Sequence, residues 1–178
     1  EGSHLLIRIV RLAHVLTCHA DDETMVPDAC ALCGIDIARA AQLIESGAPV
    51  VIAGDYNVMP TELDVYKPER WLTDALFRPE TRAAFQRLID QGWLDSLRAL
   101  HPGEVIYTFY DYFRNAYGRN AGLRIDHLLL SPALAPALRA AGTDHDIRGR
   151  EKPSDHVPTW IELDLTALAA KPAKAKKA

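Results

Sequence analysis

The chain has 178 residues, a net charge of −4, 48% hydrophobic residues and 25% charged residues. This composition excludes a wholly disordered chain, a collagen-like chain or a coiled-coil rod, and the length predicts one domain with a substantial core. No apolar run approaches the roughly 18 residues of a membrane-spanning helix, and the acidic balance argues against an indiscriminate nucleic-acid binder.

The first 36 residues differ from the rest, because they hold all three cysteines and show no regular strand pattern. An odd cysteine count without a secretory signal pattern predicts reduced thiols and a cytoplasmic location. A Cys-x-x-Cys spacing also occurs in zinc and redox sites. An alternative zinc site would therefore use Cys18, Cys30 and Cys33 with His14 and His19.

Regular patterning begins at Ile37, where apolar residues at helical spacing predict a helix that stops at Gly47. A short β-branched run over 50–53 predicts a buried strand. Residues 59–78 contain Pro60 and Pro68, are followed by Pro79, and predict a long loop. A second helix is expected over 81–91.

The second half of the chain predicts strands over 105–109, 124–130 and 157–164. A helix is expected over 133–141, and an Ala/Lys-rich tail over 166–178. This order of elements predicts a mixed α/β fold, with a sheet flanked by helices.

Acidic residues cluster with polar partners at the ends of three of these strands. The three segments are Gly54-Asp55-Tyr56-Asn57, Arg124-Ile125-Asp126-His127 and Ser154-Asp155-His156. A carboxylate in an apolar strand, such as Asp126, needs a partner, and His156 is a natural one. Carboxylates bind Mg²⁺, and a carboxylate with a histidine can activate water and stabilise a phosphate centre. The set therefore predicts phosphodiester hydrolysis.

Four motifs resemble the signature of bacterial exodeoxyribonuclease III, an apurinic/apyrimidinic endonuclease of the endonuclease/exonuclease/phosphatase superfamily. They are Gly54-Asp55-Tyr56-Asn57-Val58, Tyr107-Thr108-Phe109-Tyr110-Asp111-Tyr112, Arg119-Asn120-Ala121-Gly122-Leu123-Arg124-Ile125-Asp126-His127 and Glu151-Lys152-Pro153-Ser154-Asp155-His156-Val157-Pro158. Their order is that of the family, and the match runs from about Ile37 to about Leu165.

The resemblance implies a role for each matching residue. Asp55 would activate the attacking water and Asn57 would orient the nucleophile or the phosphate. Asp126 would hold the catalytic His156, which contacts the scissile phosphate. Asp155 and Asp55 would lie at the metal, which is expected to be Mg²⁺ with Mn²⁺ as the alternative ion.

The resemblance also implies contacts with DNA. Phe109 and Tyr110 match the aromatic pair that lines the abasic-sugar pocket, and such apolar side chains help to distort a duplex. Arg119 and Asn120 lie in a loop that could touch the DNA backbone. The expected substrate is double-stranded DNA with abasic sites or 3′ ends, without any membrane partner.

The implied fold is a partial four-layered α/β sandwich, because only the C-terminal lobe of the family domain is matched. We expect an unmatched segment over 1–36, the lobe over 37–165 and the tail over 166–178. The family's first lobe supplies a main metal-binding Glu, and no such motif precedes residue 37. We expect either that the gene has lost or frame-shifted its 5′ half, or that the chain is an intended fragment or a subunit completed by another chain.

The primary prediction is thus a Mg²⁺-dependent DNA phosphodiesterase of base-excision repair, an abasic-site endonuclease and 3′–5′ exonuclease. The first alternative is a non-catalytic or DNA-binding lobe that needs a partner. The second is a zinc-binding N-terminal segment on a repair-like lobe. A homodimer or a partner chain could cover the face that the missing lobe would contact.

Overall fold

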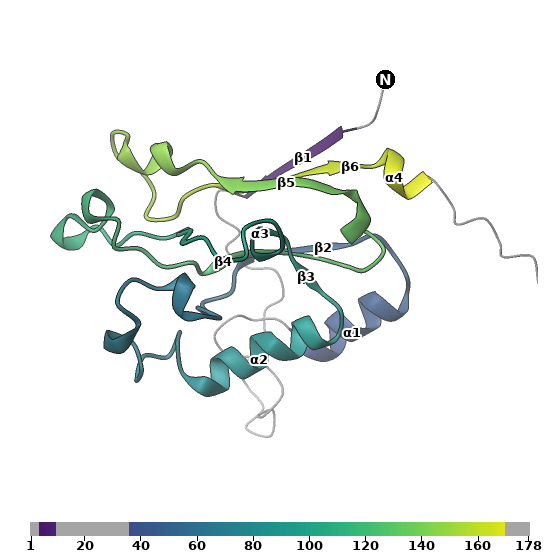
Figure 1. Cartoon of the computed structure of the whole chain (residues 1–178), viewed down its shortest axis with the longest axis horizontal. Helices are drawn as coiled ribbons and strands as arrows, with labels where there is room; N and C mark the ends of the chain where they lie inside the picture. The colour runs from purple at the N-terminus through teal and green to yellow at the C-terminus, as the bar shows by residue number, and fades with distance from the viewer. Residues whose placement is uncertain (1–3, 10–35, 170–178) are drawn as a thin grey trace, which may run out of the picture.

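Two three-stranded antiparallel sheets organise the part of the chain that the structure, a computed structural model, describes: residues 4–9 and 36–169 (Figure 1). The strands are β1 (His4–Ile9), β2 (Val51–Asp55), β3 (Leu94–Asp95), β4 (Asp126–Leu130), β5 (Leu138–Thr143) and β6 (Thr159–Asp164). The α-helices are α1 (Ile37–Glu45), α2 (Pro79–Asp90), α3 (Ser96–Leu100) and α4 (Thr166–Ala169). Short 3₁₀ helices occupy Glu62–Asp64, Pro68–Arg70, Phe113–Asn115, Tyr117–Arg119, Ala135–Ala137 and His145–Gly149.

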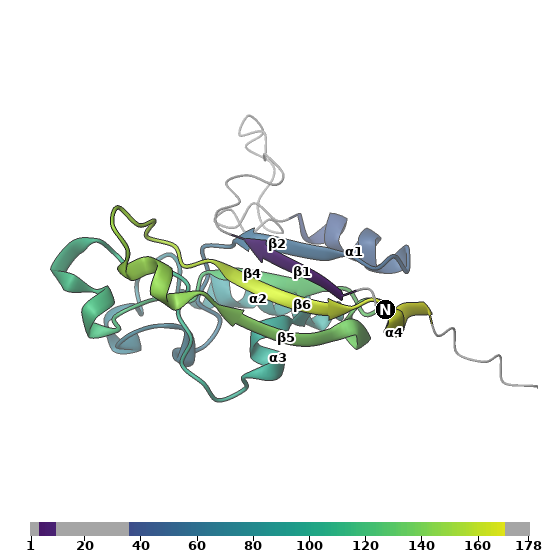
Figure 2. The ribbon, with the colours of Figure 1, turned by 90° about the horizontal axis from the view of Figure 1, so that it is seen from above.

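The strand order is β2-β4-β3 in one sheet and β1-β6-β5 in the other. The two sheets stack face to face, and α1 and α2 cover the far side of the β2-β4-β3 sheet (Figures 1 and 2). No helix among the described residues lies over the outer face of the β1-β6-β5 sheet in these views. The described chain therefore forms three layers, which fits the expected partial sandwich.

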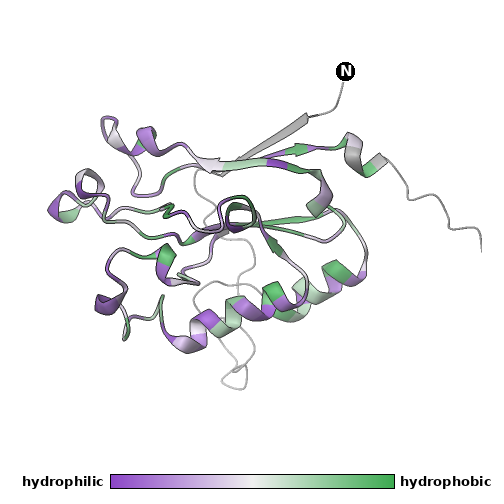
Figure 3. Ribbon diagram, viewed as in Figure 1, coloured by the Kyte–Doolittle hydropathy of each residue, from purple (hydrophilic) through white to green (hydrophobic). Residues whose placement is uncertain are grey.

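Strand β4 lies at the centre of the core, and all five of its residues are buried. Leu128 and Leu130 join the cluster that includes Ile161 of β6, whereas Leu129 joins the cluster that includes Phe85 of α2. Alternate side chains of one strand thus fill two different layers of the core, as the twofold period of a strand requires. Figure 3 shows hydrophobic residues along these strands and hydrophilic residues in many of the loops at one end of the sheets.

The ends of the two long helices follow from local sequence. The Asp36 carboxylate accepts hydrogen bonds from the N–H groups of Ala38 and Arg39, which caps α1. Gly47 follows α1 with a φ of 66°, a conformation that glycine adopts without strain. Pro79 begins α2, where its fixed φ suits the first helical turn.

The structure confirms the predicted helices at α1 and α2 and the predicted strands at β2, β4 and β6. Two other predictions were wrong. The expected helix over 133–141 is a 3₁₀ turn followed by strand β5, which pairs with β6. The expected strand over 105–109 is an irregular segment, held by isolated bridges of Phe109 to Leu123 and His156.

The expectation of no strand in the first 36 residues was also wrong. Residues His4–Ile9 form β1, an edge strand antiparallel to β6. The residues that the alternative zinc site would use, Cys18, Cys30, Cys33, His14 and His19, lie outside the described residues. Within the described residues, no helix has the length and apolarity needed to cross a membrane.

Candidate active site

Asp126 and His156 form a hydrogen-bonded pair at the end of the sheets where β4 begins. Asp126 is the first residue of β4 and is 5% exposed, while His156 lies in the loop that leads into β6. Nδ1 of His156 is 2.9 Å from Oδ2 and 3.1 Å from Oδ1 of Asp126. Because the ionised carboxylate only accepts, Nδ1–H is the donor, and Nε2 is free to face the other side of the site.

Asp55 lies on that other side, at the last residue of β2. Its Oδ2 is 3.8 Å from Nε2 of His156. Asp55 and Asp126 are partners in the antiparallel β2–β4 register, so the sheet itself fixes the spacing of the two carboxylates. Asp55, Asp126 and His156 therefore come from three separate segments of the chain, and both carboxylates lie against the His156 ring.

The hydroxyl of Thr108 holds the backbone at Asp126. This fully buried oxygen accepts hydrogen bonds from the N–H groups of Ile125 and Asp126, at 3.1 Å and 3.0 Å. The carbonyl of Thr108 accepts from the N–H of Val157, next to His156. Thr108 thus links both members of the pair. It was not singled out from the sequence, although it lies inside one of the four motifs.

Asn57 and Asp155 border Asp55. The backbone N–H of Asn57 donates to Oδ1 of Asp55 at 2.9 Å, and Asn57 has a φ of 50°, a left-handed conformation that asparagine tolerates. Asp155 is half-buried, and its backbone carbonyl accepts from the N–H of Tyr110. Both residues lie beside the cluster, and their roles there stay predictions.

The electrostatics of the cluster favour a base next to a cation. Burial raises the pKa of Asp55, the N–H of Asn57 lowers it, and the charges of Asp126 and Asp155 raise it further. Burial alone would lower the pKa of His156, but the hydrogen bond and charge of Asp126, with the charge of Asp55, raise it overall. Asp55 is thus a stronger base than a free aspartate, and His156 holds a proton to higher pH than a free histidine.

The donor set suits part of a magnesium site. Mg²⁺ is commonly bound by one or two carboxylates and several waters, and Asp55 and Asp155 can supply such oxygens. The described residues hold no group of three or more His, Cys, Asp or Glu side chains that could bind a metal ion by themselves. The carboxylates therefore fit as a partial ligand set, to be completed by phosphate, water or further protein groups.

Of the two neighbouring aromatic residues, Phe109 contacts the site, whereas Tyr110 is buried in the core. Phe109 is half-buried, and its ring packs edge-on against the His156 ring with 5.2 Å between centroids. Tyr110 is 1% exposed, and its hydroxyl donates to Oδ1 of Asn120 at 2.7 Å and lies 3.1 Å from Nε2 of His145. The expected contact of Tyr110 with DNA needs correction, because its buried ring supports the loop behind Phe109.

The loop over 112–120 is the most exposed aromatic segment near the site. Phe113 is 75% exposed and Tyr112 is 57% exposed; neither was among the residues chosen from the sequence. Arg119 and Asn120 are exposed on the same loop, and Arg119 donates from Nε to the carbonyl of Arg114. Exposed aromatic rings beside arginines are a common feature of surfaces that bind nucleic acids.

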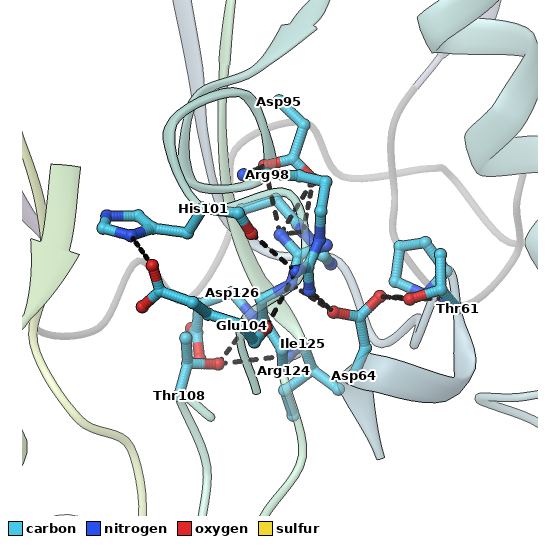
Figure 4. A network of polar contacts seen from close by, with 12 residues as sticks. Thr61, Asp64, Asp95, Arg98, His101, Glu104, Thr108, Arg124, Ile125 and Asp126 are labelled. Carbon is cyan, nitrogen blue, oxygen red and sulfur yellow. Dashed lines mark hydrogen bonds and ion pairs between the residues drawn. The ribbon is translucent and has the colours of Figure 1, made fainter. Parts of the chain in front are cut away.

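A buried ionic network lies behind the cluster and was also missed (Figure 4). Arg124, which is 1% exposed, donates to Asp64 at 2.7 Å and to Asp95 at 2.8 Å. Although burial raises the pKa of Asp64, the nearby Arg124 lowers it to about 2. Burial and the Arg124 charge lower the pKa of His127 to about 4, so this histidine is neutral and structural.

The model of the endonuclease/exonuclease/phosphatase family matches residues 31–156. This chain belongs to that family. The family is generally dependent on divalent metals, which agrees with the carboxylate cluster.

Two curated relatives confirm the resemblance that the motifs suggested. Exodeoxyribonuclease III of Haemophilus influenzae is 43% identical over 122 residues, which cover 65% of this chain and 46% of that protein. DNA repair nuclease APEX1 of Danio rerio is 38% identical over 133 residues, which cover 74% of this chain and 39% of that protein. The chain therefore spans less than half the length of these relatives.

Solved structures show the same fold. A 3′-5′ exonuclease from Neisseria meningitidis aligns with a TM-score of 0.67 and 38% identity, over 72% of this chain and 52% of that one. An AP endonuclease from Archaeoglobus fulgidus aligns with a TM-score of 0.65 and 34% identity, over 72% of this chain and 53% of that one. A structure of the Neisseria protein, described as a 3′ phosphatase bound to a product DNA hairpin, also gives a TM-score of 0.67.

Proposed function

We propose that this chain supplies the catalytic half of a Mg²⁺-dependent DNA phosphodiesterase of base-excision repair. The expected activities are cleavage 5′ to an abasic site and removal of nucleotides from 3′ ends. The observation that carries the proposal is the convergence of Asp55, Asp126 and His156 from three segments, with Nδ1 and Nε2 of one ring facing two carboxylates. The family membership supports the same reaction class.

Each residue has a distinct task in this proposal. Asp55 takes the proton from a water whose oxygen forms the new bond to phosphorus, and Asn57 orients that water or the phosphate. The bond from phosphorus to the 3′ oxygen of the leaving strand breaks, and that oxygen gains a proton from solvent. His156, kept protonated by Asp126, stabilises the charge that builds on the phosphate oxygens.

The metal would be held by Asp55 and Asp155, with Mn²⁺ as the alternative to Mg²⁺. When bound, such an ion neutralises negative charge on the phosphate. The substrate proposed is double-stranded DNA carrying abasic sites or 3′ ends, with Phe109 against the sugar and Arg119 and Asn120 near the backbone. A cytoplasmic location accords with this proposal.

A non-catalytic or DNA-binding lobe is the second candidate, and one observation favours it. The described residues hold no group of three or more His, Cys, Asp or Glu side chains that could bind a metal ion. In that case a second copy or a partner chain, packed on the outer face of the β1-β6-β5 sheet, would complete the metal-binding set.

Incision of a duplex with one abasic site separates the two candidates. We expect cutting with Mg²⁺, none with EDTA, and a large loss in Asp55→Asn. Asp90→Asn is the matched control, because Asp90 is an exposed carboxylate at the end of α2, outside the cluster. If the folded chain binds this duplex but does not cut it in Mg²⁺ or Mn²⁺, the catalytic proposal for the chain alone is wrong and the binding-lobe candidate gains.

A further inference from the structure

A cavity lies between α2, α3 and the turn at Pro60 and Thr61, and the catalytic cluster does not line it. Its volume is about 310 Å³, which lies within the size range of small-molecule sites. Asp55, Asp126 and His156 are not among the residues that line it. The proposed nuclease reaction therefore makes no use of this cavity.

The cavity has an apolar wall built by two helices and the segment between them. Phe85 and Ile89 come from successive turns of α2, and Trp93 and Leu94 lie in the link between α2 and α3. Largely apolar walls of this kind favour an aromatic or aliphatic body.

The polar part of the wall is rich in donors and poor in acceptors. Arg82, Arg98 and Arg124 all line the cavity, whereas Asp95 is the only carboxylate in its lining. A ligand that brings acceptors would match this wall better than one that brings donors.

The arginines differ in how far their charges are already balanced. Arg124 and Arg98 both contact Asp64, and Arg124 also contacts Asp95 (Figure 4). Arg82 instead donates from Nε to the carbonyl of Pro60 and lies over the Phe77 ring, and no ion pair joins it to a carboxylate among the described residues. Arg82 is half-buried, so its charge is reduced in hydration yet reachable from the cavity.

We propose that this cavity binds a small carboxylate with an aromatic or branched apolar body. The carboxylate would pair with Arg82 at the cavity edge, near Arg98, and the apolar body would lie against Phe85, Ile89 and Trp93. This site is separate from the proposed nuclease function.

Two probes of the same shape test the charge requirement, 4-methylbenzoate and its neutral counterpart 4-methylbenzamide. They are titrated into the full ¹⁵N-labelled chain while the indole N–H signal of Trp93 is followed, with Trp93→Phe used to assign that signal. We expect a saturable shift with the carboxylate and at least tenfold weaker binding of the amide. Equal affinities, or a shift that does not saturate, would overturn the proposal.

Three variants locate the site. Arg82→Gln should remove the preference for the carboxylate over the amide. Gln86→Glu adds a negative charge at an exposed lining position, and should weaken the carboxylate at least threefold while leaving the amide unchanged. Arg87→Gln, on the same helix but outside the lining, is the matched control. If Arg82→Gln fails to fold, Gln86→Glu alone decides, because an unchanged affinity in that variant contradicts the proposed site.

Discussion

Nδ1 of His156 lies 2.9 Å from Oδ2 of Asp126, the shortest ion-pair distance at the proposed catalytic cluster. The hydrogen bond and charge of Asp126 overcome the effect of burial and raise the pKa of the imidazole. In Asp126→Asn this contribution is lost, so the pKa of His156 should fall. Incision should decrease about 10²–10³-fold, the usual range for loss of a group that stabilises charge in the transition state. An NMR titration of the His156 ring and an incision assay measure the two effects.

The control for this variant is Asp90→Asn, which should change neither quantity. The Asp126–His156 pair also stabilises the fold, and the direction of its pH dependence follows from the raised pKa of His156. A histidine with a raised folded-state pKa stabilises the fold below its unfolded value near 6.5, and this contribution disappears as the pH rises through the folded-state pKa. Asp126→Asn should therefore lower the melting temperature more at pH 5.5 than at pH 8.5. An equal loss at both pH values would contradict the pairing.

The variant Asp55→Asn should lose activity but gain stability. The folded-state pKa of Asp55 is raised above 3.8 by burial and by neighbouring acids, so its ionised form destabilises the fold once the pH exceeds the folded-state pKa. Asp55→Asn should thus abolish incision yet raise the melting temperature at pH 7, by a few degrees if about 1 kcal/mol is recovered. The gain should vanish below pH 3.8. Differential scanning calorimetry at the two pH values tests this sign.

The clustering of these three residues was predictable from the sequence because each rests on a local pattern. A carboxylate at the start of an apolar strand needs a buried partner, and the segments with Asp55 and His156 offered polar groups at other strand ends. Strands β2 and β4 were likewise predictable from short β-branched or apolar runs bounded by turns. The catalytic tasks of these side chains remain proposals, to be decided by the variants above.

The elements that were missed depend on contacts across the fold. The alanine-rich segment before Gly142 has high helical propensity, yet it pairs with β6, and Gly142 lies opposite Trp160 with no room for a side chain. Propensity is a weak prior against such packing. Arg124 and Asp64 are 60 residues apart in the sequence, so no local pattern could show that they pair.

Thr108→Val tests how the backbone at Asp126 is held. Valine keeps the shape of threonine but removes the buried oxygen that accepts the N–H groups of Ile125 and Asp126. Two buried donors would then lack a partner, so the free energy of unfolding should fall by about 1–3 kcal/mol. Thr108→Ser keeps the oxygen and should retain most of the stability. Urea unfolding of both variants checks this, and equal losses would assign the effect to the methyl group.

Asp64 should control the acid stability of the lobe. Arg124 overcomes the effect of burial and lowers the pKa of Asp64 from 3.8 to about 2. The ionised carboxylate therefore stabilises the fold fully above pH 3.8, and this contribution is lost as the pH falls toward 2. Asp64→Asn leaves Arg124 buried with a broken network, and should cost about 3–5 kcal/mol at pH 7. The difference in unfolding free energy between wild type and variant should shrink between pH 4 and pH 2. Urea unfolding across that range tests the argument, and a constant difference would show that the charge of Asp64 contributes nothing.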